Sequence, residues 1–144
     1  MCEGAGLPIV VALTPGQAHE STMLETLLDS VGVGGKPGPP RRHFEVVSGD
    51  KGYDGEASRR IIRSHGSVPL IPHRKRRDGS HPPGKGDFDK TLYRRRNVVE
   101  RLIARVKENR RIATRYDKLA ETFRAFVVLG FIRIWSQTLL SDTP

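Results

Sequence analysis

The stretch YRRRNVVERLIARVK, residues 93–107, contains a single acidic residue, Glu100, among five arginines and one lysine. A carboxylate in such surroundings is either the partner of a surface ion pair or a metal ligand beside cations that hold phosphates. On a helix, which turns by about 100° per residue, four side chains would fall within an arc of about 60°: Tyr93, Arg96, Glu100 and Lys107. Arg96 and Glu100 also have the spacing of a simple i,i+4 ion pair. Geometry alone leaves both interpretations open.

A second carboxylate, Asp50, lies in the segment VVSGDKGYD, directly after a predicted strand. In open α/β sheets, ligand sites form at the carboxyl ends of the strands. Asp, Gly and Lys are also ordinary turn residues, so Asp50 alone is better explained as part of a turn. Asp50 together with Glu100 is more specific, because a phosphoryl-transfer centre with two Mg²⁺ ions needs carboxylates that converge from separate elements.

The chain resembles a known family at these same residues. The spacing Y-x2-R-x3-E-x6-K, carried by Tyr93, Arg96, Glu100 and Lys107, resembles the signature around the last acidic residue of the DDE transposases of bacterial insertion sequences, in the groups numbered four and five. The segment GDKGYD, which contains Asp50, resembles the motif of their second acidic residue. The segments GLPIVVALTPGQAHE and RNVVERLIARVKENRRIATRYDKLAETFRAFVVLGFIRIW resemble that family too, so the resemblance covers almost the whole chain.

This resemblance implies an α/β fold, an RNase H-like mixed sheet flanked by helices, and DNA transposition by metal-dependent cleavage and strand transfer at transposon ends. Asp50 and Glu100 would be the catalytic ligands of Mg²⁺ or Mn²⁺. Arg96 and Lys107 would bind phosphates near the cleaved strand, and Tyr93 would position the transposon end. The alternatives are a non-catalytic basic DNA-binding module and the product of a decayed gene.

The first acidic residue of that family lies on a strand upstream of the region that begins with GLP. The resemblance therefore predicts that residues 1–144 are the C-terminal part of a catalytic domain that lacks its first strand and is inactive alone. Glu3 is a candidate substitute, but the acidic residue at this place in the family sits in a turn and is not a ligand. Pairing with an upstream half of the transposase, or a homodimer, is expected.

The charge of the chain is uneven. Residues 1–56 hold 4 basic and 8 acidic side chains, a net charge of −4, whereas residues 57–144 hold 21 and 8, a net charge of +13. A field of one sign predicts a polyanionic partner, with DNA favoured over a membrane surface. A basic flexible loop is predicted at about residues 73–90, although a merely solvated loop is the alternative. The cations predicted to contact DNA phosphates are Arg74, Lys75, Arg76, Arg77, Arg110 and Arg111.

Compartment signals are few. Cys2 is the only cysteine, which excludes a disulfide within the chain and favours a reducing cytoplasm. The apolar stretch AFVVLGFIRIW is interrupted by Arg133 and is shorter than the ~20 residues of a membrane span, so no membrane is expected.

Apolar periodicity and turn residues predict three strands and four helices. The strands are expected over Leu7–Leu13, His43–Ser48 and Ser67–Pro72. The helices are expected from Ser21 or Thr22 with a Thr22–Glu25 capping box, over Gly55–His65 with Asp54 as N-cap, over Asp89–Ala113, and over Lys118–Leu140. The third helix is expected to pack a stripe on the sheet: Val99, Leu102, Ile103 and Val106.

Overall fold

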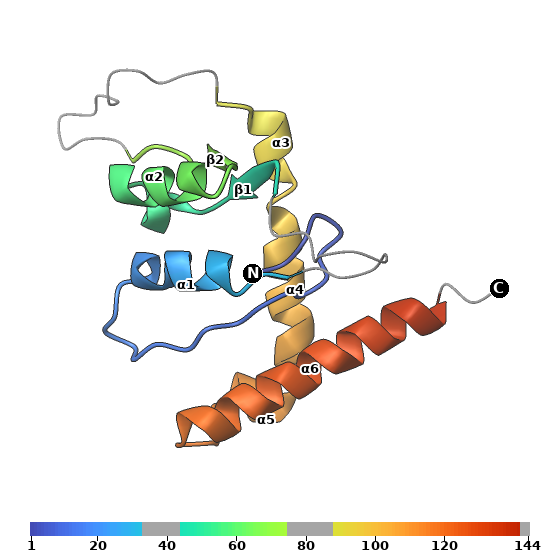
Figure 1. The fold of residues 1–144 in the computed structure, drawn as a ribbon. Helices are drawn as coiled ribbons and strands as arrows, with labels where there is room; N and C mark the ends of the chain where they lie inside the picture. Colours follow the sequence, from blue (N-terminus) through green and yellow to red (C-terminus); the bar gives the residue numbers. More distant parts are fainter. Residues whose placement is uncertain (33–43, 75–87, 142–144) are drawn as a thin grey trace. The chain divides into compact units, whose positions relative to one another are not determined.

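The computed structural model describes residues 1–32, 44–74 and 88–141 (Figure 1). These residues belong to two compact units. The sheet unit is residues Thr14–Arg96, and the helical unit combines Met1–Leu13 with Asn97–Pro144. Each unit has its own core and is described by itself.

The sheet unit contains two short parallel strands, β1 (Val46–Ser48) and β2 (Val68–Leu70), joined through helix α2 (Glu56–Ser64) (Figure 1). Val46 pairs with Val68 and Ser48 with Leu70. Both strands lie where the apolar runs predict them, although His43 falls outside the described residues. Parallel pairing through a helical crossover agrees with the expected α/β class.

The core of the sheet unit brings helix α1 (Leu24–Asp29) and α2 together with the strands. Its buried apolar residues are Leu24, Leu28, Val31, Val47, Ile62, Leu70 and Ile71. Leu24 and Leu28 on α1 have helical spacing, and Val31 follows the helix; all three are buried. The Thr22–Glu25 capping box is wrong: a short 3₁₀ helix, η1 (Glu20–Met23), precedes α1, and the Thr22 hydroxyl donates to the carbonyl of His19.

Helix α2 begins after Gly55, which provides no side-chain cap. The prediction that Asp54 is the N-cap is therefore wrong, because its carboxylate is used elsewhere. The predicted end is confirmed: Gly66 follows the helix with a φ of 74°, a left-handed conformation that glycine adopts without strain.

The helix predicted over Asp89–Ala113 is three helices, α3 (Lys90–Arg94), α4 (Asn97–Lys107) and α5 (Arg110–Ala113). The prediction of one continuous helix is wrong because caps compete with helix continuation. Asn109 accepts the Arg111 N–H at 3.1 Å and so starts a new helix. The first break, at Arg95 and Arg96, lies at the boundary between the two units.

The strand predicted over Leu7–Leu13 is also wrong. This segment makes one isolated bridge, between Cys2 and Pro8, and folds back on the first residues through hydrogen bonds such as Ile9 N–H to Met1 O at 3.0 Å. A β-branched run forms a strand only where a neighbouring strand pairs with it. The described residues of the helical unit contain no such partner.

The helical unit packs α4 and α5 against the long helix α6 (Ala120–Ser141). Its buried residues include Leu102, Ile112, Val127 and Ile134. The Trp135 indole N–H donates to the carbonyl of the buried Pro8 at 2.9 Å and ties the first residues to α6. In the predicted stripe of α4, Leu102 is buried but Ile103 is 43% exposed. Packing of this stripe on the sheet stays a prediction.

Helix α6 has 22 residues and is longer than the apolar stretch within it. By length and composition alone the whole helix could cross a membrane, although the apolar stretch AFVVLGFIRIW is itself shorter than a span. A single helix of this kind is weak evidence for a membrane span.

Gly130 allows α6 to approach its neighbours closely. A Cβ at this position would lie 3.2 Å from Cδ1 of Ile112 and 4.0 Å from Cγ1 of Val106. We expect Gly130→Val to lower the free energy of unfolding by about 1–3 kcal/mol through overpacking, measured by urea titration. Ser136→Val is the control, because Ser136 is exposed on the same helix. Equal unfolding midpoints for the two variants would contradict the close packing.

A histidine links α1 to the end of α2. His65 Nε2 lies 2.9 Å from Asp29 Oδ1, and His65 Nδ1 lies 2.8 Å from the carbonyl of Ile61. The hydrogen bond to Asp29, followed by that to Ile61, raises the pKa of His65 above its usual 6.5. A raised pKa means that the protonated ring stabilises the fold.

We therefore expect a pH-dependent difference in the free energy of unfolding between the wild type and Asp29→Asn. The difference should be fully present below pH 6.5, the usual pKa of histidine, and should shrink as the pH rises through the raised pKa of His65. Urea titrations between about pH 5 and 9 measure it. Glu56→Gln is the control, since Glu56 pairs with Arg63 instead. A difference that grows with pH would rule out this assignment.

Candidate metal and phosphate site

Asp50 lies at the carboxyl ends of both parallel strands. The strand β1 ends at Ser48, and the Gly49 N–H donates to the carbonyl of Leu70 at 3.2 Å. Asp50 then caps the 3₁₀ helix η2 (Lys51–Tyr53), because its Oδ1 accepts the Gly52 N–H at 2.7 Å. Asp50 thus has the position that the sequence predicts, and its turn geometry is real as well.

The second oxygen of Asp50 faces a cation. Arg96 Nη2 lies 4.0 Å from Asp50 Oδ2, and the Asp50 side chain is 43% exposed. This distance exceeds a direct hydrogen bond, so the pair is held by charge alone. Within the sheet unit, the structure therefore brings a predicted metal carboxylate and a predicted phosphate-binding arginine side by side.

Tyr93 belongs to the same unit and lies on α3, whose N-terminus is capped by Asp89. Its ring packs against Phe88, with centroids 5.0 Å apart and planes inclined by 56°. The side chain is half-buried, so its position is set by this contact.

Asp54 is the centre of an ionic cluster four residues after Asp50. Its side chain is 8% exposed, and Oδ1 accepts from Arg59 Nη2 at 2.7 Å and lies 3.0 Å from His73 Nδ1. Oδ2 accepts the Arg74 N–H. Burial alone would raise the pKa of Asp54, but the bonds from Arg59 and Arg74 and the nearby His73 outweigh it and lower that pKa.

Sequence reasoning missed this cluster, but a signal for it exists. Arg59 is buried three residues before the core residue Ile62, so both lie on the inward face of α2. A charged residue on an apolar face predicts a buried partner of opposite charge. Asp54 is that partner.

The helical unit carries the other predicted residues. Glu100 and Lys107 are exposed on α4, seven residues apart and therefore on one face of the helix. Their relation to Asp50 and Arg96 in the other unit stays a prediction. Lys75, Arg76 and Arg77 lie outside the described residues.

Two further arginines differ in what they bind. Arg110 is exposed at the start of α5. Arg111 donates from Nε and Nη2 to the two oxygens of Asp117, both at 3.0 Å, and its guanidinium lies 4.1 Å from the centre of the Phe126 ring. This bidentate pair competes with any phosphate contact, because the same N–H groups would be needed for both.

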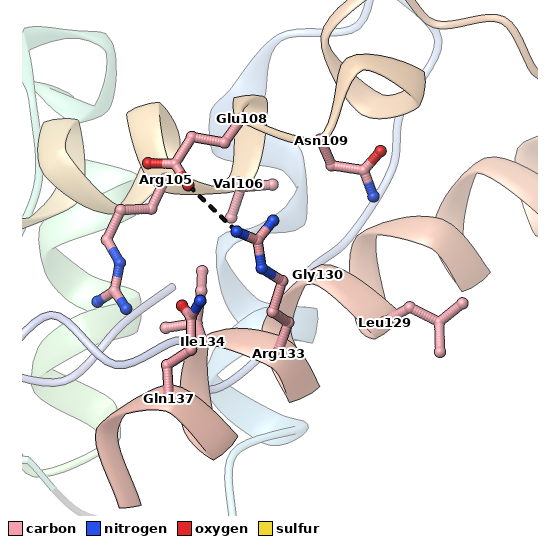
Figure 2. Close-up of a pocket in the computed structure, with 9 residues that line it drawn as sticks. All are labelled: Arg105, Val106, Glu108, Asn109, Leu129, Gly130, Arg133, Ile134 and Gln137. Carbon is pink, nitrogen blue, oxygen red and sulfur yellow. Dashed lines mark ion pairs between the residues drawn. The ribbon is translucent and has the colours of Figure 1, made fainter. Parts of the chain in front are cut away.

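A small cavity of about 80 Å³ lies between α4 and α6 (Figure 2). Arg133 Nη2 lies 3.6 Å from Glu108 Oε2 across it, and Arg105 also lines it. Both members of the ion pair are more than half exposed, so the pair contributes little to stability.

The donor chemistry of Asp50 suits Mg²⁺ or Mn²⁺. Mg²⁺ takes oxygen ligands and keeps several waters, and one or two protein carboxylates together with substrate phosphates suffice to hold it. Among the residues that the structure describes, no three His, Cys, Asp or Glu side chains gather in a ready-made metal cage. Glu3 offers little, because its two oxygens accept the N–H groups of Ala5 and Leu7, both at 3.0 Å.

Comparison with known proteins identifies a family for this chain. Residues 1–135 match the family described as Transposase DDE domain. A protein of Burkholderia cepacia, described as a transposase for insertion sequence element IS402, is 34% identical over 135 residues, which cover 93% of this chain and 59% of that protein. A protein of Brucella ovis, described as a transposase for insertion sequence element IS6501, is 29% identical over 138 residues, 92% of each chain.

The chain thus spans 59% of the length of the Burkholderia cepacia relative. No solved structure matches the chain significantly. The family match extends over nearly all of the sequence and includes both carboxylate motifs, at Asp50 and at Glu100. The chain belongs to the family of insertion-sequence transposases with a DDE domain.

Proposed function

We propose that this chain is part of a catalytic domain that cleaves and transfers DNA strands in transposition, with Asp50 and Glu100 as ligands of a divalent metal ion. The observation that carries the proposal is the pairing of the Asp50 carboxylate with Arg96, 4.0 Å away, at the carboxyl ends of two parallel strands. In such a pair the carboxylate can bind a metal ion, and the guanidinium can bind the phosphate that the metal ion holds.

Each residue has a separate task in this proposal. Mg²⁺ or Mn²⁺, when bound, would polarise the phosphate and activate the attacking oxygen. Arg96 and Lys107 hold non-bridging phosphate oxygens, and Tyr93, fixed against Phe88, positions the transposon end. Asp50 is kept in one orientation because the Gly52 N–H donates to its Oδ1.

The fold and assembly are part of the same proposal. The parallel strands and their helical crossover support an RNase H-like mixed sheet. The family resemblance implies three carboxylates, and we assign two of them within residues 1–144. We therefore propose that the chain is part of a catalytic domain that acts in the cytoplasm on transposon ends and target DNA, either paired with a segment that carries the third carboxylate or as a homodimer.

A non-catalytic basic DNA-binding module is the second candidate, favoured by the net charge of +13 in residues 57–144. Metal dependence separates the two functions. We would measure Mn²⁺ binding to the complex of the chain with a short duplex by calorimetry, for the wild type, Asp50→Asn and Glu100→Gln. A metal site formed by both carboxylates predicts weaker binding in each variant. Equal binding in all three would favour the basic module.

A further inference from the structure

Asp54 is a buried carboxylate to which the proposed chemistry gives no task. It contacts three segments of the sheet unit: it follows η2, it pairs with Arg59 on α2, and it bonds His73 and the backbone of Arg74 after β2. Arg59 Nη2 also donates to the carbonyl of Ile71 at 2.9 Å. These bonds connect the end of the turn formed by residues 50–54 (the Asp50 turn) to residues 71–74, which follow β2.

Stability alone explains this arrangement poorly. Burying two charges costs free energy that their attraction only partly offsets, and apolar residues of similar size often replace a buried ion pair without loss. The directions of the bonds matter more, because a carboxylate with Arg59, His73 and the Arg74 N–H around it can adopt only one position. The cluster therefore specifies geometry.

That geometry bears on Asp50 through Lys51. Arg74 Nε donates to the carbonyl of Lys51, the residue after Asp50, at 2.7 Å. The backbone N–H of the same Arg74 is held by Asp54. The turn from Asp50 to Asp54 is thus bound to Arg74 near both of its ends. The Arg74 guanidinium contacts Lys51, which is next to the proposed metal ligand Asp50 in the sequence.

We propose that Asp54 is a positioning residue: its carboxylate holds the Asp50 turn and Arg74 in a fixed relation, so that the carboxylate of one and the guanidinium of the other engage the same metal-bound phosphodiester. This inference rests on the proposed function and deepens it. It also gives the second aspartate of GDKGYD, Asp54, a role other than metal binding, because both of its carboxylate oxygens are bonded within the protein.

The Gly52 amide provides a direct test, because its N–H is bonded to Asp50 Oδ1. Substoichiometric Mn²⁺ broadens the amide resonances nearest to the bound ion in ¹H–¹⁵N spectra. We expect broadening of Gly52 in the wild type and its loss in Asp50→Asn. In Asp54→Asn, we expect that about a 10-fold higher Mn²⁺ concentration is needed for the same broadening. Losses of this size in metal affinity are typical when a residue that orients a metal ligand is replaced.

Glu56→Gln is the matched control. Glu56 forms an exposed ion pair with Arg63 at 2.8 Å on the same helix as Arg59, so this variant also loses one carboxylate. We expect its Mn²⁺ response to equal that of the wild type. Equal responses of Asp54→Asn and Glu56→Gln would overturn the proposal.

A metal-free measurement separates the positioning role from the metal site and from global folding. Hydrogen exchange at the Gly52 and Arg74 amides should accelerate in Asp54→Asn, while exchange at the core residues Val47 and Ile62 stays slow. If Asp54→Asn unfolds, His73→Gln removes only one partner and should give a smaller acceleration at the same two amides. Unchanged exchange at Gly52 in a folded variant would overturn the positioning role. Absence of wild-type Mn²⁺ broadening would instead count against the proposed metal site.

Discussion

Incubated alone with a supercoiled plasmid that carries candidate transposon ends, the 144-residue chain should leave the plasmid uncut in either Mg²⁺ or Mn²⁺. The proposal assigns two carboxylates, Asp50 and Glu100, of the three that the family resemblance implies. A two-metal centre places its ions about 3.5–4 Å apart, and a shared carboxylate is needed to hold both. Positioning and electrostatic stabilisation supply nearly all of phosphoryl-transfer catalysis, so the loss should be severe.

The control for this prediction adds the part of a relative that lies outside the match. The Burkholderia cepacia relative has 41% of its length outside the match (100% − 59%). Supplied as a separate polypeptide, that part should restore nicking if it carries the third carboxylate, and Glu100→Gln should remove the restored activity. Metal-dependent nicking by the 144-residue chain alone would contradict the prediction. Loss of such nicking in Glu3→Ala would then identify Glu3 as the third ligand.

DNA binding should weaken steeply with salt, and the segment 74–77 should account for a large part of that dependence. Each phosphate that a cation neutralises contributes about −0.9 to the slope of log K against log salt concentration. Replacing Arg74, Lys75, Arg76 and Arg77 by alanine should therefore flatten the slope by up to about 3.6. Between 50 and 200 mM salt, this difference amounts to about a 10²-fold change in relative affinity.

Fluorescence anisotropy with a labelled duplex measures the slope. The charge-matched control replaces four exposed cations elsewhere by alanine, namely Arg60, Arg63, Lys118 and Arg124. Arg74→Ala alone should flatten the slope by about 0.9, the contribution of one phosphate contact. An unchanged slope in the fourfold variant would show that the segment does not contact phosphates.

Local patterns predicted the elements whose apolar residues meet one another within the sheet unit. Leu24 and Leu28 have helical spacing and are buried, and the strand around Val47 follows from its β-branched run. Asp50 was placed correctly because a strand followed by GD determines where the turn begins. These features depend on interactions between residues that are close in the sequence, so they can be predicted from the sequence.

Features that depend on distant partners were not predictable in the same way. The run at Leu7–Leu13 has strand propensity, but its described surroundings offer no strand to pair with. The break before Arg110 arises because the Asn109 side chain caps a new helix. The Asp54–Arg59–His73 cluster joins residues up to 19 positions apart. The helical spacing of Arg59 and Ile62 indicates that Arg59 has a buried partner, but it does not identify Asp54 or His73 as that partner.

The central claim is that Asp50 and Glu100 bind one divalent metal centre, although they belong to separate units. Iron-mediated cleavage tests it most directly. Fe²⁺ is bound in place of Mg²⁺ in the complex with DNA, where it generates hydroxyl radicals that cut the polypeptide backbone next to the ion. The account predicts two cuts, one near Asp50 and one near Glu100, which disappear together in Asp50→Asn and in Glu100→Gln. A cut near only one of the two residues, or cuts that survive both substitutions, would contradict it.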